Sequence, residues 1–162
     1  MPTKNVAQVL SFLLGPFTKL TNRLTELLMP SEENLKNRAS FEESTILTFY
    51  TIAGALSALA NHDSVAKHSA FYTVDGDIQM GITDVCYATL RVRNHTFETI
   101  KEKPDTPRAI MEFKTIDLAN ALFNGTASTM AELCAGNIYM SGMINMIDNV
   151  NRILDRVGMY LG

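Results

Sequence analysis

The spacing of apolar residues changes near Asp63, and this change constrains the fold more than any other feature of the sequence. Before Asp63, apolar residues recur every three or four positions, which is the period of an α-helix with a buried face. After it, apolar and polar residues alternate in several short stretches, which is the period of a β-strand. We therefore predict an α+β fold, in which N-terminal helices precede a mostly antiparallel sheet of about five strands that helices cover on one face.

Two helical segments are predicted ahead of this change. Residues 6–28 carry an apolar stripe, and we expect an interruption near Pro16, because proline lacks an amide hydrogen and clashes with the preceding turn. A second helix is expected to begin at Ser40, which has the spacing of a capping box with Glu43, and to run to Asn61. This second helix is apolar on more than one side, which indicates that it is buried against other elements.

The alternating segments predict short strands joined by tight turns. The predicted strands are 70–74, 78–82, 86–93, 97–101, 109–113 and 137–141. Asp75-Gly76 is typical of a hairpin turn, and Asn94-His95 is expected to form a second turn. Because strand side chains alternate between faces, the apolar residues of each strand are expected to share one face of the sheet.

Three further helices are predicted around and after the last strand. Thr115 is expected to cap a short helix that runs to Phe123, and Thr129 with Glu132 forms a capping box for another that ends near Gly136. The final helix carries an apolar stripe that consists of Met143, Met146, Ile147, Val150, Ile153, Leu154, Val157, Tyr160 and Leu161. We expect this stripe to pack against the core.

The sequence carries no recognisable catalytic or metal-binding motif. His62, His68 and His95 have no partners at the spacing of metal ligands, and Cys86 and Cys134 lie far apart without a CxxC pattern. There is no nucleophile elbow, phosphate-binding loop or dinucleotide-binding glycine motif. We therefore expect no catalytic residue, no metal site and no cofactor, and we do not expect the protein to be an enzyme.

Charge and composition narrow the kinds of partner. The formal net charge is −3, whereas nucleic-acid-binding domains are usually strongly basic, so we expect no nucleic-acid partner. No apolar run approaches the ~20 residues that cross a bilayer, and no small-residue cleavage site follows the apolar N-terminus. We therefore expect a cytoplasmic protein whose cysteines remain reduced.

Two runs near the C-terminus, LANALFNGTAST at 118–129 and AELCAGNIYMSGMINMIDNVNRIL at 131–154, resemble the sterol carrier protein type 2 family of lipid-binding domains. In that family a short helix ends in a glycine, a second short helix follows, and a strand of the form Gly-x-Ile-x-Ile/Met-x-Gly leads into the last helix. The positions that match this frame are Gly125, Gly136, Ile138, Met140 and Gly142. The resemblance extends more weakly back to about Ser64. We therefore divide the chain into an N-terminal helical extension, 1–62, and a sterol-carrier-like lipid-binding domain, 63–162.

The resemblance implies a non-enzymatic carrier that holds a long-chain lipid, such as a fatty acid, an acyl-CoA, an isoprenoid or a sterol, in an apolar tunnel between sheet and helices. Methionine suits the wall of such a tunnel, because its unbranched, polarisable side chain adapts to varied aliphatic ligands. The predicted lipid-binding residues are Phe97, Met111, Phe113, Leu118, Leu122, Phe123, Met130, Leu133, Ile138, Met140, Met143, Met146, Ile147, Val150 and Leu154. The same methionine spacing is also the ordinary pattern of a solid core, so a closed core remains an alternative.

Other functions stay open at this stage. The same fold without a ligand would suit an interaction or scaffold module of a lipid or quinone pathway, because some bacterial relatives in this family resemble accessory factors for ubiquinone synthesis. Its N-terminal helices would then form a homodimer, or would rest transiently on a membrane surface, since residues 1–38 combine an apolar stripe with a slight excess of positive charge. An enzyme acting on a lipid would need a polar dyad inside the cavity, for which the sequence offers no candidate.

Overall fold

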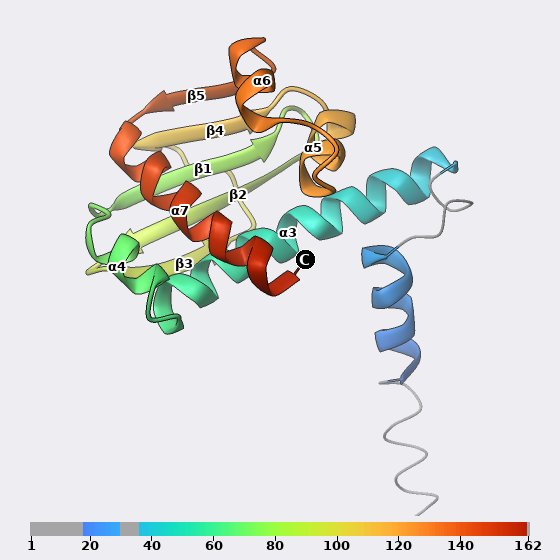
Figure 1. Ribbon diagram of the computed structural model, residues 1–162, viewed down its shortest axis with the longest axis horizontal. Helices are drawn as coiled ribbons and strands as arrows, with labels where there is room; N and C mark the ends of the chain where they lie inside the picture. The colour runs from blue at the N-terminus through green and yellow to red at the C-terminus, as the bar shows by residue number, and fades with distance from the viewer. Residues whose placement is uncertain (1–17, 30–35, 162) are drawn as a thin grey trace, which may run out of the picture. The chain divides into compact units, whose positions relative to one another are not determined.

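Five strands form one mixed sheet in the order β3-β2-β1-β4-β5 (Figure 1). Their bounds are Gly76–Ile82 for β1, Cys86–Arg93 for β2, Thr96–Ile100 for β3, Ala109–Phe113 for β4 and Ile138–Gly142 for β5. β1 and β4 run parallel, and the other neighbouring pairs are antiparallel. The central strand is β1, and its residues 78–82 are all buried.

This computed structural model describes residues 18–29 and 36–161, apart from the side chain of Leu161. The chain divides into two compact units, Met1–Leu47 and Thr48–Gly162. The first unit contains a helix over residues 18–28 and the beginning of α3 (Arg38–His62), and the sheet belongs to the second unit. The predicted interruption near Pro16 lies outside the described residues, and the domain boundary after residue 62 stays a prediction.

Helices cover one face of the sheet (Figure 1). Besides α3, they are α4 (Ala66–Phe71), α5 (Ile116–Phe123), α6 (Thr129–Cys134) and α7 (Ile144–Leu161). The core lies between these helices and the sheet, and its fully buried side chains include Phe49 and Leu56 from α3, Leu90 from β2, and Met146 and Ile153 from α7. The predicted α+β class and the coverage of one face by helices are therefore confirmed.

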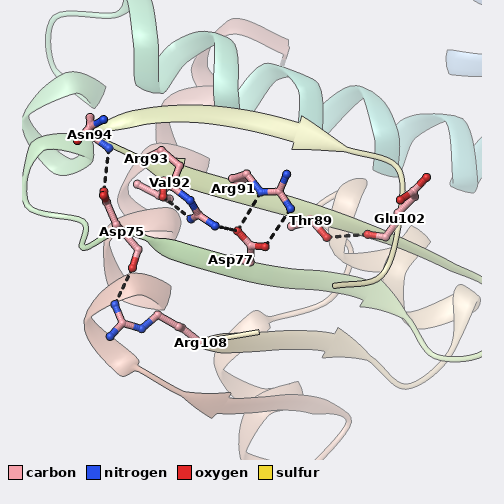
Figure 2. Close-up of polar contacts among 9 residues, drawn as sticks. All are labelled: Asp75, Asp77, Thr89, Arg91, Val92, Arg93, Asn94, Glu102 and Arg108. Atoms are coloured by element: carbon pink, nitrogen blue, oxygen red, sulfur yellow. Dashed lines mark hydrogen bonds and ion pairs between the residues drawn. The ribbon is translucent and has the colours of Figure 1, made fainter. Parts of the chain in front are cut away.

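The other face of the sheet is polar (Figure 2). Asp77 on β1 accepts two hydrogen bonds of 3.2 Å from Arg91 and forms an ion pair of 3.0 Å with Arg93. The hydrogen bonds from Arg91 hold the pKa of Asp77 below its ordinary value. Thr89 donates to the carbonyl of Glu102 at 2.7 Å, which fastens the loop between β3 and β4 to this face. These polar residues alternate with core residues along β1 and β2, as the predicted period of two requires.

Asp63 joins the start of α4 to the end of α7. Its carboxylate accepts hydrogen bonds from the amide of Ala66 at 2.8 Å, from Arg156 at 3.2 Å and from the hydroxyl of Tyr160 at 3.0 Å. The hydrogen bond from Ala66 is the largest cause that lowers the pKa of Asp63 to about 2, and those from Arg156 and Tyr160 add to it. The ionised carboxylate therefore stabilises the contact between the two helices.

The strand predicted at 70–74 is wrong, because this stretch belongs to α4 and to the connection that follows it. The buried pair here is Ala66 and Ala70, which share one face of a helix at a spacing of four residues. Phe71 and Tyr72 remain 59% and 58% exposed. The apolar alternation covered so few residues that it did not distinguish a strand from a helix.

One of the two predicted turns is confirmed. Asn94 and His95 join β2 to β3 with φ angles of 49° and 62°, the left-handed region that a tight hairpin turn requires. The hairpin predicted at 75–76 is wrong, since the second of these residues already begins β1. The turn between β1 and β2 lies at 83–85, where Asp84 has a φ of 57°.

The predicted helix starts agree with the structure in part. Thr115 caps α5, since its side chain accepts a hydrogen bond from an amide in the first turn. The capping box at Ser40 is wrong, because α3 begins earlier, at Arg38, and an asparagine ahead of it accepts an amide hydrogen bond. The cap of α6 is Ser128, one residue before the predicted Thr129.

Candidate functional site

A cavity of about 460 Å³ lies between the apolar face of the sheet and the helices that cover it. Its lining comes from α3, β1, β4, α5, α6, β5 and α7. The lining residues are Phe49, Ile52, Met80, Met111, Phe113, Leu122, Phe123, Thr129, Ile138, Met140, Asn151, Leu154 and Asp155. This volume lies within the range of pockets that bind small organic molecules.

Three methionines form a row across the floor of this cavity. Met80 of β1 lies opposite Met111 of β4, and Met111 lies opposite Met140 of β5. Residues opposite one another in neighbouring strands share a face of the sheet, so the three side chains border the same space. Met80 and Met111 are only 3% and 4% exposed. A floor of flexible thioether side chains can adapt to aliphatic ligands of different shape.

Short helices form one side of the cavity, and a glycine ends each of them. α5 has 8 residues and α6 has 6, and they are followed by Gly125 at φ 67° and Gly136 at φ 75°. The amides of these glycines donate to the carbonyls of Leu122 and Leu133, each at 3.1 Å, which is typical of a left-handed helix end. Each helix therefore covers only part of the sheet, and the cavity occupies space that a longer helix would fill.

A third glycine fixes the start of α7. Gly142 has a φ of 87°, and a Cβ at this position would collide with the carbonyl oxygen of Arg108. That same carbonyl accepts a hydrogen bond of 2.8 Å from the amide of Met143. The close approach lets the chain leave β5 and turn directly into α7, which crosses the sheet (Figure 1) and contributes residues to the cavity lining.

The polarity of the lining changes from floor to mouth. The buried lining residues are apolar, and Phe49 and Ile138 are only 1% and 3% exposed. The lining residues that are exposed to solvent are Thr129, Asn151 and Asp155, all of them polar. The cavity is therefore apolar where it is buried and polar where its lining is exposed to solvent.

The structure brings only part of the predicted lipid-binding residues to the cavity. Those that line it are Met111, Phe113, Leu122, Phe123, Ile138, Met140 and Leu154. Those outside the lining are Phe97, Leu118, Met130, Leu133, Met143, Met146, Ile147 and Val150. The lining residues that the sequence did not predict are Phe49, Ile52, Met80, Thr129, Asn151 and Asp155.

The two sides of α7 account for much of this difference. Met146 and Val150 lie on the side that packs into the core, where they are 0% and 1% exposed. Asn151, Leu154 and Asp155 lie on a neighbouring side, because residues three and four positions apart share a helix face. Apolar periodicity in the sequence identifies the core side of a helix. It does not identify polar residues at a cavity mouth, such as Asn151 and Asp155.

The ends of the predicted apolar stripe also differ from expectation. Met143 precedes α7 and is 37% exposed, and Tyr160 is 61% exposed. Met130, which the sequence placed at the cavity, is 69% exposed on α6. These side chains lie at chain turns and at a helix end, where periodicity no longer determines which side is covered.

The described lining of the cavity contains few groups that can transfer a proton. Among the described residues that line it, Asp155 is the only acid or base, and no group of His, Cys, Asp and Glu in the described part of the chain could hold a metal ion. Burial raises the pKa of Cys86 to about 11, so this thiol stays protonated and is a poor nucleophile. Within residues 18–29 and 36–161, no helix has both the length and the apolar character that crossing a membrane requires.

Comparison with solved structures identifies the fold. No protein family model and no curated protein sequence matches this chain. A structure described as UbiJ-SCP2 ubiquinone synthesis protein matches 68% of this chain and 94% of its own, with 12% identity and a TM-score of 0.51. The sterol carrier protein domain 2 of Helicoverpa armigera matches 67% of this chain and 86% of its own, with 10% identity and a TM-score of 0.50. The chain therefore has the sterol carrier protein type 2 fold, which confirms the fold that the resemblance predicted.

Proposed function

We propose that this protein is a non-enzymatic, cytoplasmic lipid carrier, which holds one long-chain lipid in the cavity beneath α7. The observation that carries the proposal is the apolar cavity of about 460 Å³, with its methionine floor and its polar mouth. The shared fold of structures described as sterol carrier proteins adds support.

The size of the cavity sets the scale of the binding energy. A water molecule takes up about 30 Å³, and a methylene group takes up a similar volume, so the cavity corresponds to roughly fifteen methylenes. At ~0.8 kcal/mol per buried methylene, such a chain gains about 12 kcal/mol. Association costs at least ~4 kcal/mol in lost translational and rotational freedom, so the affinity reaches the micromolar level at most. Burial of an aliphatic tail is therefore the main favourable contribution in the proposed binding.

The proposal is tested by identifying what the purified protein carries. Native mass spectrometry of the full chain is expected to show a bound lipid, and an organic extract is expected to contain it in near-stoichiometric amount. Met140→Phe is expected to reduce the bound fraction, because Met140 lines the cavity. Met130→Phe is the matched control, since this exposed methionine lies outside the lining. A ligand-free wild-type protein that also fails to take up added long-chain lipids would contradict the proposal.

A second candidate function is an interaction module of a lipid or quinone pathway. It is favoured by the helix over residues 18–28, where Leu20, Leu24 and Leu28 form an exposed apolar stripe. Ser44 donates a hydrogen bond to the carbonyl of Leu27, so part of this helix contacts the start of α3 while the stripe remains uncovered. The structural match described as a ubiquinone synthesis protein is consistent with such a role.

This second function predicts a homodimer through the N-terminal helices, or a transient contact with a membrane surface. Lys19 and Arg23 add positive charge to the same helix, as is common in helices that lie on anionic lipid surfaces. Two measurements on the full chain and on a variant without residues 1–30 distinguish the dimer from the membrane contact: light scattering and co-sedimentation with anionic vesicles. A loss of dimer mass on deletion supports dimerisation, and loss of co-sedimentation with anionic vesicles supports the membrane contact. If the full chain and the deletion variant are both monomeric and neither binds vesicles, the interaction-module function is wrong.

A further inference from the structure

The described residues at the mouth of the cavity carry one negative charge and no positive charge. Asp155 contributes a carboxylate, and the other polar lining residues, Thr129 and Asn151, are neutral. Among the described residues that line the cavity, there is no lysine, arginine or histidine. A ligand whose polar end rests at this mouth therefore meets hydrogen-bonding groups and one anion.

The arginines nearest along α7 are engaged elsewhere. Arg152 forms an ion pair of 3.0 Å with Asp148, and Arg156 forms one of 3.2 Å with Asp63 at the start of α4. Neither arginine borders the cavity. Within the described part of the chain, Asp155 itself forms no ion pair.

An anionic head group at this mouth would be unfavourable for two reasons. It would lose part of its hydration on approaching the cavity without gaining a cationic partner. It would also lie close to a carboxylate of the same charge, and such repulsion grows as water is excluded. A hydroxyl group has neither problem, because Thr129 and Asn151 offer both donors and acceptors to it.

We infer that the cavity selects long-chain lipids with an uncharged, hydrogen-bonding head group, such as an alcohol, over lipids with an anionic head group, such as fatty acids and acyl-CoA. This inference rests on the proposed lipid-carrier function and names the class of ligand for that site. Asp155 is the residue that determines the selection, and a cationic head group is accepted at least as well as a neutral one.

The inference is tested by competition between three ligands with the same tail. The assay measures how well each ligand displaces the uncharged fluorescent probe phenylnaphthylamine from the full-length chain. The ligands are dodecanol, dodecanoate and dodecylammonium, and the pH is mildly alkaline so that dodecanoate is ionised. Wild type is expected to bind dodecanol and dodecylammonium at least about fivefold more tightly than dodecanoate. High salt is expected to narrow the difference, because it screens charges near the surface.

A carboxylate is better hydrated than a hydroxyl, so dodecanoate would bind less tightly than dodecanol even at a neutral mouth. The decisive quantity is therefore the change in the ratio of dodecanol affinity to dodecanoate affinity between wild type and variants. Asp155→Asn is expected to lower this ratio, and Asp155→Lys is expected to lower it by at least about tenfold. Asp105→Lys is the matched control, because it makes the same charge change in the loop on the polar face of the sheet. It is expected to leave the ratio unchanged.

The outcomes separate the inference from the proposed function. If dodecanoate binds wild type as tightly as dodecanol, or if Asp155→Lys leaves the ratio unchanged, the head-group inference is wrong and the carrier function stands. If none of the three ligands displaces the probe and no lipid is bound, the carrier function fails and the inference fails with it. A lowered ratio in Asp155→Lys with an unchanged ratio in Asp105→Lys supports both.

Discussion

A matched pair of methionine-to-phenylalanine substitutions separates ligand space from core packing. Met140 is half-buried on β5 and lines the cavity, whereas Met146 on α7 is 0% exposed and lies outside the lining. The same chemical change at the two positions should therefore have opposite consequences. At Met140 the added ring enters empty space, and at Met146 it enters a filled core.

The magnitude at Met140 follows from the volume that the ring takes from the ligand. Phenylalanine is larger than methionine by roughly 30 Å³, which is about the volume of one methylene, worth ~0.8 kcal/mol of ligand burial. We therefore expect lipid affinity to fall by about fourfold. Unfolding stability should change by less than about 1 kcal/mol, because the space is open.

At Met146 the same ring overpacks the core. We expect a loss of about 1–3 kcal/mol in the free energy of unfolding, with lipid affinity nearly unchanged. A chain of this size loses roughly 2–4 °C in melting temperature for each kcal/mol. Fluorescent-lipid titration and thermal unfolding of both variants supply the two measurements. Equal loss of stability at both positions, with no loss of affinity at Met140, would refute the assignment of open space above β5.

Four other substitutions test further parts of the structure. Gly142→Ala should lower the free energy of unfolding by at least about 1–3 kcal/mol, because φ is 87° and the new Cβ would collide with the carbonyl of Arg108. Gly158→Ala on α7 is the control: its Cβ meets no atom, and thermal unfolding should show a gain of about 0.5–1 kcal/mol. Asp63 has a pKa of about 2, below its unfolded value, so its stabilising effect is present above about pH 4 and is lost as the pH falls toward 2. Chemical unfolding of Asp63→Asn should therefore show a lower free energy of unfolding at neutral pH and a weaker dependence of that free energy on pH in this window. If the pH dependence equals that of wild type, the Asp63 carboxylate is not its source. Phe123→Trp places the only tryptophan of the chain at the cavity. Its emission should change on addition of dodecanol, and higher dodecanol concentrations should be needed when Met140→Phe is also present.

Local signals in the sequence predicted much of the architecture correctly. The apolar period of α7 placed Met146 and Val150 on its core side, and both are buried. Gly125 and Gly136 indicated where two short helices end, and both have the left-handed φ angles that such ends need. These features depend on a few neighbouring residues, so periodicity and turn chemistry are sufficient to find them.

The cavity could be predicted only in part, because its lining depends on pairings between distant segments. Met80 is separated from Met111 along the chain, and they become neighbours only because β1 and β4 pair in parallel. The sequence contains both residues, but the order of strands in the sheet decides that they share the floor. Phe49 on α3 is likewise brought to the cavity lining by packing rather than by any local pattern.

The side of α7 that stabilises the fold and the side that borders the cavity are separate. Val150 and Ile153 point into the core and are 1% and 0% exposed, whereas Asn151 and Asp155 border the cavity mouth and are exposed. A polar change at the mouth therefore costs little stability, because exposed side chains contribute few buried contacts. If the protein carries a lipid as proposed, we expect substitutions at Asp155 to alter head-group preference while the apolar stripe of the same helix continues to hold the sheet. The apolar lining and the polar rim would then be tuned independently, because they lie on different sides of α7.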